Sequence, residues 1–419
     1  MSALHTSSPA LSYYIATTPS APDRPALSGD VRCDVCVIGA GITGLSTALH
    51  LARQGFKVVV LESHTVGWGA SGRSGGQALI GYNTGFSDIA ARVGRDDARK
   101  IWDLGVYAKD LLVDTVREHS IACDLKWGYL MMAIKPRHLN DLARYKDELE
   151  SVSGYEGLHL FDHVEARARI GSDTFIGGLS DPGSGHLHPL NYTQGLARAA
   201  EHSGAVIYET TPASHIQDGP TPHVTTPGGT VACDHVIVGA NAYLGNLAPA
   251  LGRKILPTHS HIVATEPLGD DVARSLIRDD ACAIDMNHLL NYWRLSADKR
   301  LLFGGHVSRG KNTSDIKKIL GATMRRVYPQ LQGRAIDYAW GGRVAVTRNL
   351  LPHFGREGKN VYFAQGFSGH GILLAGLAGK LMAGAVQGTA EDFDVFTRIP
   401  HAPFPGGALL RTPTRNSDR

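Results

Sequence analysis

Three glycines and one glutamate near the start of the sequence have the types and the spacing needed to hold a dinucleotide. Gly39, Gly41 and Gly44 form a GxGxxG pattern, and Glu62 follows at close to the distance of about 20 residues expected for a ribose-binding acid. The first glycine permits a tight turn, the second lets a pyrophosphate approach the backbone, and the third lets helix and strand pack closely. N–H groups at the start of the helix can then hold the phosphates.

The elements that must position these residues lie on either side of them. The apolar run 35–38 predicts a buried strand before the turn, and the apolar positions within 45–52 predict a helix after it. The run 57–61 predicts a second strand, which ends at Glu62. A GxGxxG pattern also arises by chance in a chain with 49 glycines. The strand–turn–helix–strand context favours dinucleotide binding over a merely structural turn.

Further glycine-rich stretches are expected to approach the same flat ligand, because glycine backbone allows close contact. One is the loop 63–81. A second follows the apolar run 231–241, predicted as one strand, and a third is the turn 366–371 between a strand and a helix at 372–386. The intervening segments predict helices at 87–120, 139–152 and 189–203, and strands at 125–134, 259–266, 292–295 and 301–305. The nucleotide-type segments are therefore interleaved with other material, which is typical of a flavin enzyme.

Composition excludes several classes of function. The net charge of +3 is too small to indicate nucleic acid or an anionic membrane as a partner. The apolar stretch 361–386 contains His370, Lys380 and several glycines, so we interpret it as a buried helix rather than a membrane span. The first twelve residues lack the pattern of a signal peptide, and we expect a cytoplasmic protein.

The cysteines and the paired histidines are interpreted as structural. Cys33 and Cys36 form a CxxC without a second such pair, and the five cysteines are scattered, which fits a reducing compartment. The pairs 186/188 and 259/261 are HxH patterns, but no acid or cysteine accompanies them at ligand spacing. No metal site is predicted.

Six motifs carry a resemblance to a known family. Over about 13–386 the chain resembles the D-amino-acid oxidase/glycine oxidase group of FAD enzymes and, within it, is most similar to the γ-glutamylputrescine oxidoreductases. Two of the motifs, GASGRSGGQ and GFSGHGI, are fairly specific, whereas GAGITG alone is not. The six motifs are GAGITG at 39–44, VGWGASGRSGGQ at 66–77, GHLHPLNY at 185–192, YWRLSADKRLLFGG at 292–305, WGGRVAVTRNLLPHFG at 340–355 and GFSGHGI at 366–372.

The resemblance implies an α/β fold (α+β overall), with a Rossmann-like FAD-binding domain interlaced with an antiparallel-sheet substrate domain. We expect an N-terminal arm at 1–30, which Tyr13 and Tyr14 are apolar enough to dock. The remaining boundaries are 31–90, 165–250 and 336–388 for the FAD-binding domain, 91–164 and 251–335 for the substrate domain, and 389–419 for a C-terminal tail.

The resemblance also implies oxidation of a C–N bond in a small-molecule amine. Hydride would pass from the carbon bearing the amine to flavin N5, and the resulting imine would hydrolyse to an aldehyde. O2, giving H2O2, or another acceptor would reoxidise the flavin. The FAD is expected to be non-covalent, because no histidine or cysteine occurs within 67–77. We expect a monomer or a homodimer.

The motifs and the resemblance together assign the site residues. Catalytic roles are predicted for His370, Tyr292, Trp293 and Arg343, and Trp340 is a further candidate for an aromatic pocket that keeps the amine neutral. Arg294 and Lys299 are cations that could assist the reaction with oxygen. Cofactor contacts are predicted for Gly39, Ala40, Gly41, Ile42, Thr43, Gly44, Glu62, Ser63, Ala70, Ser71, Gly72, Arg73, Ser74, Gly75, Gly76, Gln77, Ala213, Gly239, Ala240, Gly342, Arg343, Gly369, His370, Gly371 and Ile372.

One departure from the family pattern bears on the substrate. In sarcosine oxidases of this group, a lysine that binds the substrate carboxylate follows the GHG turn after one residue. Here that position is Leu373, which favours an amine without an adjacent carboxylate, as in γ-glutamylputrescine or a related polyamine derivative. Arg343 could bind a remote carboxylate or contact the flavin. A D-amino-acid or N-methyl-amino-acid oxidase or dehydrogenase, and a non-catalytic or electron-transfer flavoprotein subunit, remain the alternatives.

Overall fold

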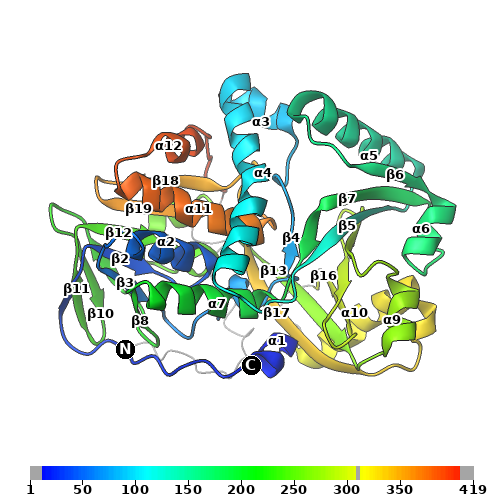
Figure 1. Ribbon diagram of the computed structural model, residues 1–419, viewed down its shortest axis with the longest axis horizontal. Helices are drawn as coiled ribbons and strands as arrows, with labels where there is room; N and C mark the ends of the chain where they lie inside the picture. The colour runs from blue at the N-terminus through cyan, green and yellow to red at the C-terminus, as the bar shows by residue number, and fades with distance from the viewer. Residues whose placement is uncertain (1–11, 308–311, 406–419) are drawn as a thin grey trace.

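The computed structural model describes residues 12–307 and 312–405. Figure 1 shows a six-stranded sheet with its helices on one side of the molecule and a larger, nine-stranded sheet on the other. The long helix α4 (Arg95–Glu118) rises between them and packs against α11 (Gly371–Val386). The predicted architecture, a Rossmann-like part interlaced with a sheet-based part, is confirmed.

The six-stranded sheet carries the dinucleotide motif. Its central strands are buried on both faces, which explains their continuous apolar sequence. Helix α2 (Ile42–Ala52) packs against α11 and against α7 (Pro189–His202). All neighbouring strands are parallel except the first pair; their order is β18 (His353–Glu357), β19 (Val361–Gln365), β12 (His235–Val238), β2 (Val35–Ile38), β3 (Val58–Leu61) and β8 (Val206–Tyr208).

The nine-stranded sheet is mostly antiparallel, with one parallel pair between β14 and β5. Helix α10 (Thr313–Val327) packs on one of its faces. Its strands are, in order, β17 (Ile336–Val346), β13 (Leu256–Thr265), β16 (Leu301–Gly305), β15 (Tyr292–Leu295), β14 (Cys282–Asp285), β5 (Lys126–Ala133), β7 (Gly177–His186) and β4 (Gln77–Ala78), with β6 (His159–Asp162) paired to β7.

A small four-stranded sheet and several helices complete the described chain. The small sheet contains β1 (Val31–Arg32), β11 (Gly229–Ala232), β10 (His223–Thr226) and β9 (His215–Gln217). Two of its strands, β1 and β11, directly precede strands β2 and β12 of the six-stranded sheet along the chain. The other helices are α1 (Tyr13–Thr17), α3 (Phe86–Val93), α5 (Pro136–Glu148), α6 (His163–Arg169), α8 (Pro249–Gly252), α9 (Asp270–Leu276) and α12 (Glu391–Thr397).

The structure corrects the single strand that was predicted at 231–241. The chain leaves the four-stranded sheet at the end of β11 and enters the six-stranded sheet at β12. Cys233 donates its N–H to the carbonyl of Pro222, whereas Asp234 donates to the carbonyl of Asp34, so the change of partner falls between these two residues.

The division of the chain between the two large sheets also differs from the expected boundaries. Strand β7 lies within 165–250 and β17 within 336–388, both expected in the FAD-binding domain, yet both belong to the nine-stranded sheet. Conversely, α4 lies within 91–164 and packs on α11 of the nucleotide-binding side. Segments expected in one domain, such as 165–250 and 91–164, therefore contribute to both parts.

The two ends of the described chain are packed rather than loose. Tyr13 and Tyr14 of the N-terminal arm are 3% and 0% exposed. Helix α12 lies in the stretch expected as a tail, but its Phe393 and Phe396 are fully buried. Positions 406–419 of that expected tail, and 1–11 of the arm, lie outside the described residues. Within the described ranges no single helix is both long and apolar enough to cross a membrane; α11 and α12 qualify only as a pair bent by 116°.

Candidate functional site

The glycine turn after β2 has the close packing that its sequence predicts. Gly39 has a φ of +103°, in the region that favours glycine, and its N–H donates to the carbonyl of Leu61 at 2.8 Å. A Cβ on Gly44 would lie 2.0 Å from the carbonyl oxygen of Gly39. Strand and helix can approach this closely only because position 44 carries no side chain.

The start of α2 offers backbone donors to a ligand. Its N-cap is Gly41, which has no side chain to cap the first turn. Ser71, from the glycine-rich loop, accepts a hydrogen bond from the N–H of Ile42 at 3.0 Å. Ala40 and Thr43 are buried, whereas the backbone of Gly41 is partly exposed. The positive end of the helix therefore lies at the glycine loop, where the phosphates of a dinucleotide are expected.

Glu62 is positioned at the end of β3 by two backbone hydrogen bonds. Its Oε2 accepts from the N–H of Ala40 at 2.8 Å and its Oε1 from the N–H of His64 at 3.0 Å. Burial raises the pKa of Glu62, and the backbone donors oppose that shift by favouring the carboxylate. The next residue, Ser63, is exposed. The carboxylate lies where hydroxyls of an adenosine ribose would supply further donors.

Two segments from the middle of the chain meet the same turn. The N–H of Gly239 donates to the carbonyl of Ile38 at 2.9 Å, and a Cβ on Gly39 would lie 3.1 Å from the oxygen of Gly239. The N–H of Thr211 donates to the carbonyl of Glu62 at 2.7 Å. This places Gly239 and Ala240 beside the turn, and Ala213 follows Thr211 by two residues; all three are partly exposed.

The glycine-rich loop folds back on itself around a short 3-10 helix, Ala70–Gly72. A Cβ on Gly72 would lie 2.2 Å from the carbonyl oxygen of Gly67. The guanidinium of Arg73 donates from Nε to the carbonyl of Trp68 at 2.7 Å and from Nη1 to the carbonyl of Gly341 at 3.3 Å. Burial lowers the pKa of Arg73, because its described partners are backbone carbonyls rather than carboxylates.

The end of the loop is fixed to the nine-stranded sheet. Arg294 on β15 donates from Nε to the carbonyl of Gly75 at 2.7 Å, and Gln77 donates from Nε2 to the carbonyl of Ala283 at 3.1 Å. Gly76 has a φ of +74° and accepts from the N–H of Leu187 at 2.8 Å. The side chains of Ser74 and Gln77 are partly exposed. The loop is thus a bridge between the two sheets.

Tyr292 lies directly beneath this loop. A Cβ on Gly304 would fall 2.1 Å from its ring, and a Cβ on Gly75 would fall 2.7 Å from it, so both neighbours must be glycine. Its hydroxyl lies 2.8 Å from Oγ of Ser260 on β13. Burial raises the pKa of Tyr292, so the phenol is neutral. The side chain remains partly exposed, which places a neutral hydrogen-bonding pair at the site.

Trp293 is a correction to the predicted site. Successive residues of a strand point to opposite faces of the sheet, so the neighbour of Tyr292 points away from the loop. Trp293 is 1% exposed and stacks between Phe175 and Phe303, with ring centroids 5.6 and 5.7 Å away. It packs in the hydrophobic core on that face of the sheet.

The C-terminal glycine turn joins three parts of the chain. Asn241 accepts a hydrogen bond from the N–H of Gly366 at 2.9 Å, and Ser368 donates its N–H to the carbonyl of Ala345 at 3.1 Å. Asn83 donates to the carbonyl of Ser368 at 2.8 Å. The turn then leads into α11, whose first residue is Gly371.

His370 occupies the N-cap position of α11 but caps none of its N–H groups with its side chain. Its Nδ1 is buried and has no hydrogen-bond partner. Burial lowers the pKa of His370 to about 4, so the imidazole is neutral near pH 7. Gly369 is exposed and Gly371 partly so, while Ile372 is buried. An unpartnered buried nitrogen beside a helix start makes His370 a candidate for contact with a ligand.

The structure places Arg343 on the face of β17 opposite to Trp340 and Gly342. Trp340 donates from Nε1 to the carbonyl of Arg73 at 3.0 Å, and a Cβ on Gly342 would lie 3.3 Å from Cβ of Arg73. Successive residues of a strand point to opposite faces of the sheet, so the side chain of Arg343 points away from the face that contacts Arg73. Its guanidinium lies 5.8 Å from the ring centroid of Tyr243, which itself packs on the loop. Arg343 is therefore not placed with Tyr292 and His370.

Sequence reasoning missed the importance of Ser260 and misread Arg294. Ser260 stands between the two histidines of an HxH pattern, and alternation on β13 points it, rather than them, toward Tyr292. Arg294 is 2% exposed and holds the loop. Lys299 pairs with Asp280 at 3.4 Å. The HxH residue His188 accepts from the N–H of Asn191 at 3.1 Å, capping α7.

The described residues fit an FAD molecule. They provide two helix starts whose N-cap residues make no side-chain cap, a carboxylate at the end of β3 and a glycine-rich loop that is partly exposed. In the described ranges no group of three or more histidine, cysteine or acidic side chains is arranged to hold a metal ion.

Comparisons with known proteins identify the family of the chain. A family model described as FAD dependent oxidoreductase matches residues 34–385. The chain is 42% identical over 405 residues to the probable oxidoreductase OrdL of Haemophilus influenzae, covering 96% of this chain and 93% of that protein. It is 40% identical over 411 residues to the γ-glutamylputrescine oxidoreductase of Escherichia coli, covering 98% and 95%.

Among solved structures, glycine oxidase from Geobacillus kaustophilus superposes with a TM-score of 0.75 at 22% identity, covering 89% of this chain and 100% of that one. This likeness supports the fold. The family match and the two relatives, which align over nearly the whole chain, identify the chain as an FAD-dependent oxidoreductase. The chain therefore belongs to the DAO family of FAD-dependent oxidoreductases, enzymes that act on amine and amino-acid substrates.

Proposed function

We propose that this enzyme oxidises the C–N bond of an amine without a carboxylate next to the reacting carbon, with γ-glutamylputrescine or a related polyamine derivative as its substrate. The observation that carries the proposal is the 40% identity to the γ-glutamylputrescine oxidoreductase of Escherichia coli over 98% of this chain. The glycine oxidases of Geobacillus kaustophilus and Bacillus subtilis are 24% and 26% identical. The comparison favours an amine over an α-amino acid.

The start of α11 supports the same choice. Leu373 occupies the position at which the resembled sarcosine oxidases carry a carboxylate-binding lysine, and it is 1% exposed. Its neighbour Ile372 is 5% exposed. An apolar position buried in the core gives no electrostatic attraction for a substrate carboxylate next to the reacting carbon.

The polar groups at the site suit a neutral amine. Only the neutral amine can lose hydride, and burial disfavours its ammonium form. The Tyr292–Ser260 pair and the unpartnered Nδ1 of His370 are neutral hydrogen-bonding groups. In the proposal they orient the substrate without holding it as a cation.

FAD, when bound, supplies the two-electron acceptor for the oxidation. The amine loses a hydride from carbon and a proton from nitrogen, and water converts the imine to an aldehyde and ammonia. O2, giving H2O2, or another acceptor completes the cycle. The proposal includes non-covalent FAD, because 67–77 contains no cysteine or histidine. It places the reaction in polyamine catabolism in the cytoplasm.

A second candidate is oxidation of an amino acid, favoured by the TM-score of 0.75 with a glycine oxidase. Steady-state turnover of γ-glutamylputrescine, putrescine, glycine, sarcosine and D-alanine separates the two. The proposal expects kcat/KM to be highest for γ-glutamylputrescine, with one aldehyde and one ammonia formed per substrate. A higher kcat/KM for any of the amino acids would replace it by the second candidate.

A further inference from the structure

The N-terminal segment 12–18 is packed against the part of the nine-stranded sheet that supports the glycine loop. Ser12 caps α1 by accepting from the N–H of Ile15 at 3.2 Å. The hydroxyl of Thr17 lies 3.1 Å from Nε2 of His188. The side chain of Tyr14 is 0% exposed. The helix therefore buries its two tyrosines, whereas Ile15, Ala16 and Thr17 are exposed.

Tyr14 occupies the centre of a small cluster of side chains. Its hydroxyl accepts from Nη2 of Arg294 at 3.2 Å. Its ring packs edge-on against Trp340, with centroids 5.2 Å apart, and against His188 at 4.8 Å. Tyr14 is therefore in contact with one side chain from β15, one from β17 and one at the start of α7.

Two of these neighbours hold the backbone of the glycine loop. Arg294 donates to the carbonyl of Gly75 at 2.7 Å, and Trp340 donates to the carbonyl of Arg73 at 3.0 Å. Arg294 is 2% exposed, and its described acceptors are the carbonyls of Gly75 and Leu295 and the hydroxyl of Tyr14. Removing that hydroxyl would leave a buried, charged N–H without a partner.

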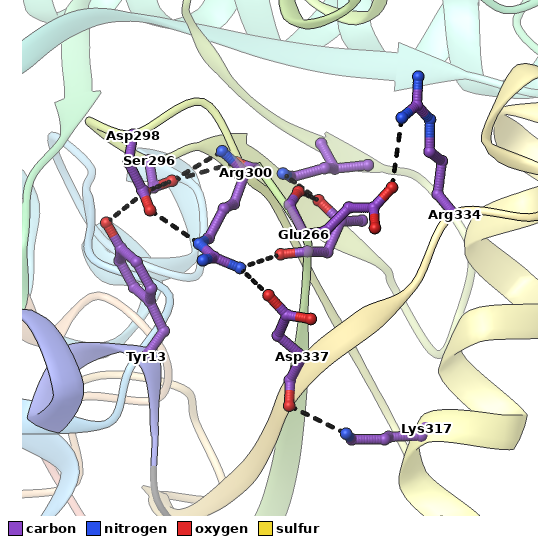
Figure 2. A network of polar contacts seen from close by, with 10 residues as sticks. Tyr13, Glu266, Ser296, Asp298, Arg300, Lys317, Arg334 and Asp337 are labelled. Carbon is purple, nitrogen blue, oxygen red and sulfur yellow. Dashed lines mark hydrogen bonds and ion pairs between the residues drawn. The ribbon is translucent and has the colours of Figure 1, made fainter. Parts of the chain in front are cut away.

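Tyr13 anchors the same helix through a separate network. Its hydroxyl donates to Oδ1 of Asp298 at 2.7 Å, and Asp298 also accepts from Ser296 and Arg300. Figure 2 shows this network continuing from Arg300 to Asp337 on β17. None of these drawn contacts reaches the glycine loop. Tyr13 therefore anchors α1, whereas Tyr14 contacts the side chains that hold the loop.

We propose that α1 is a positioning element for the cofactor: Tyr14, through Arg294 and Trp340, holds the loop segment Arg73–Gly75 against bound FAD. Tyr14 does not itself touch the cofactor. It fixes the orientation of Arg294 and closes the space beside Trp340, so the loop keeps one conformation. The inference depends on FAD binding in this family and not on the identity of the amine.

The test compares two holoenzyme variants that each lose one hydroxyl. Tyr14→Phe removes the acceptor of Arg294 and keeps the ring, and Tyr13→Phe removes the bond to Asp298 as a matched control. Flavin fluorescence follows release of FAD, and far-UV circular dichroism follows unfolding of the backbone during the same heating. The rate of FAD release after dilution is measured separately at room temperature.

For Tyr14→Phe we expect FAD release to be about 3- to 10-fold faster, the loss expected for one buried hydrogen bond, and to precede backbone unfolding on heating. For Tyr13→Phe we expect an unchanged release rate, with both midpoints shifted together. Equal release rates in Tyr14→Phe and the parent enzyme, or the same acceleration in both variants, would overturn the proposal and leave α1 a structural element only.

Discussion

His370 and Tyr292 are uncharged at neutral pH for the same physical reason. Burial lowers the pKa of His370 to about 4 and raises that of Tyr292, so each stays in the form that costs least to desolvate. The charged side chains nearby serve the loop: Arg73 and Arg294 donate to backbone carbonyls. At the residue scale, the candidate site combines neutral hydrogen-bonding groups with cations that hold the backbone.

The neutrality of His370 predicts the pH dependence of turnover. Because a primary amine titrates near pH 10, kcat/KM should rise with pH over about 6–9 as the neutral amine accumulates. His370→Asn should lower kcat/KM, since it alters the hydrogen-bonding group, and should keep the same slope. Profiles of both enzymes check this. A break near pH 6–7 in the parent enzyme that vanishes in His370→Asn would contradict it, because it would show an ionising histidine.

Tyr292 and Trp293 predict opposite outcomes for the same kind of substitution. Tyr292→Phe keeps the ring over Gly304 and removes the hydroxyl beside Ser260, so we expect kcat/KM to fall by about 2- to 10-fold with little change in stability. Trp293→Phe leaves a cavity in the core, so we expect a loss of about 1–3 kcal/mol in the free energy of unfolding.

Steady-state kinetics and urea unfolding are measured for both variants, Tyr292→Phe and Trp293→Phe. Trp293→Phe should keep kcat/KM within about twofold, because its ring lies on the far face of the sheet. A large loss of kcat/KM in Trp293→Phe with unchanged stability would show that the face assignment is wrong.

At the scale of elements, the junction of β2, α2 and β3 depends on a single missing side chain. The carbonyl of Gly39 lies where a Cβ of Gly44 would be. By contrast, Gly376 in α11 has open space, since a Cβ there would meet its nearest neighbour at 3.9 Å. These two helical glycines therefore differ in function although both lie in buried helices.

Gly44→Ala and Gly376→Ala test this difference. Gly44→Ala should push α2 from β2 and reduce FAD binding by more than about tenfold, because the phosphate-binding turn opens. Gly376→Ala should keep its flavin and gain up to about 1 kcal/mol in stability, as expected when a helical glycine is replaced without a clash. The ratio of flavin to protein after purification measures both. Full flavin content in Gly44→Ala would contradict the account.

The elements that sequence predicted well are those whose pattern is local. The run 35–38, the glycines of the turn and Glu62 specify one another within a short stretch, and all are found together. The face of a residue on a short strand is not local, because it depends on register with neighbours; this is why Trp293 and Arg343 were assigned to the site. Only Asp234 and His235 separate the apolar residues of β11 from those of β12, so the two strands were predicted as one.

At the scale of the whole molecule, the chain crosses repeatedly between the two large sheets. The loop 66–77 leaves the six-stranded sheet and ends at β4 of the nine-stranded one, and β17 precedes β18 in the same way. Domain boundaries could not be predicted from sequence, because the crossings fall inside the expected domains: β4 lies within 31–90, β7 within 165–250 and β17 within 336–388. The site forms where these crossings meet.

Buried neutral histidines make the stability of the whole chain depend on pH. Burial lowers the pKa of His188 and His353 to about 3 and that of His261 to about 4. A folded pKa below the ordinary 6.5 stabilises the fold above pH 6.5, and this contribution is lost as pH falls toward 4. At pH 5 each of these histidines should lower the free energy of unfolding by about 2 kcal/mol.

Urea unfolding at about pH 7.5, 7, 6 and 5 measures this dependence. The midpoint should change little between about pH 7.5 and 7 and then fall steadily toward pH 5. A midpoint that is the same at pH 7.5 and at pH 5 would show that these histidines are not held neutral in the folded chain.

The central claim is that the bound flavin accepts electrons from an amine without an adjacent carboxylate. Anaerobic titration of the holoenzyme with γ-glutamylputrescine, putrescine, sarcosine and D-alanine, followed by the visible absorption of oxidised flavin, tests it most directly. The account predicts rapid bleaching by γ-glutamylputrescine and little by the two amino acids. Bleaching by the amino acids alone, with the amines inert, would contradict it.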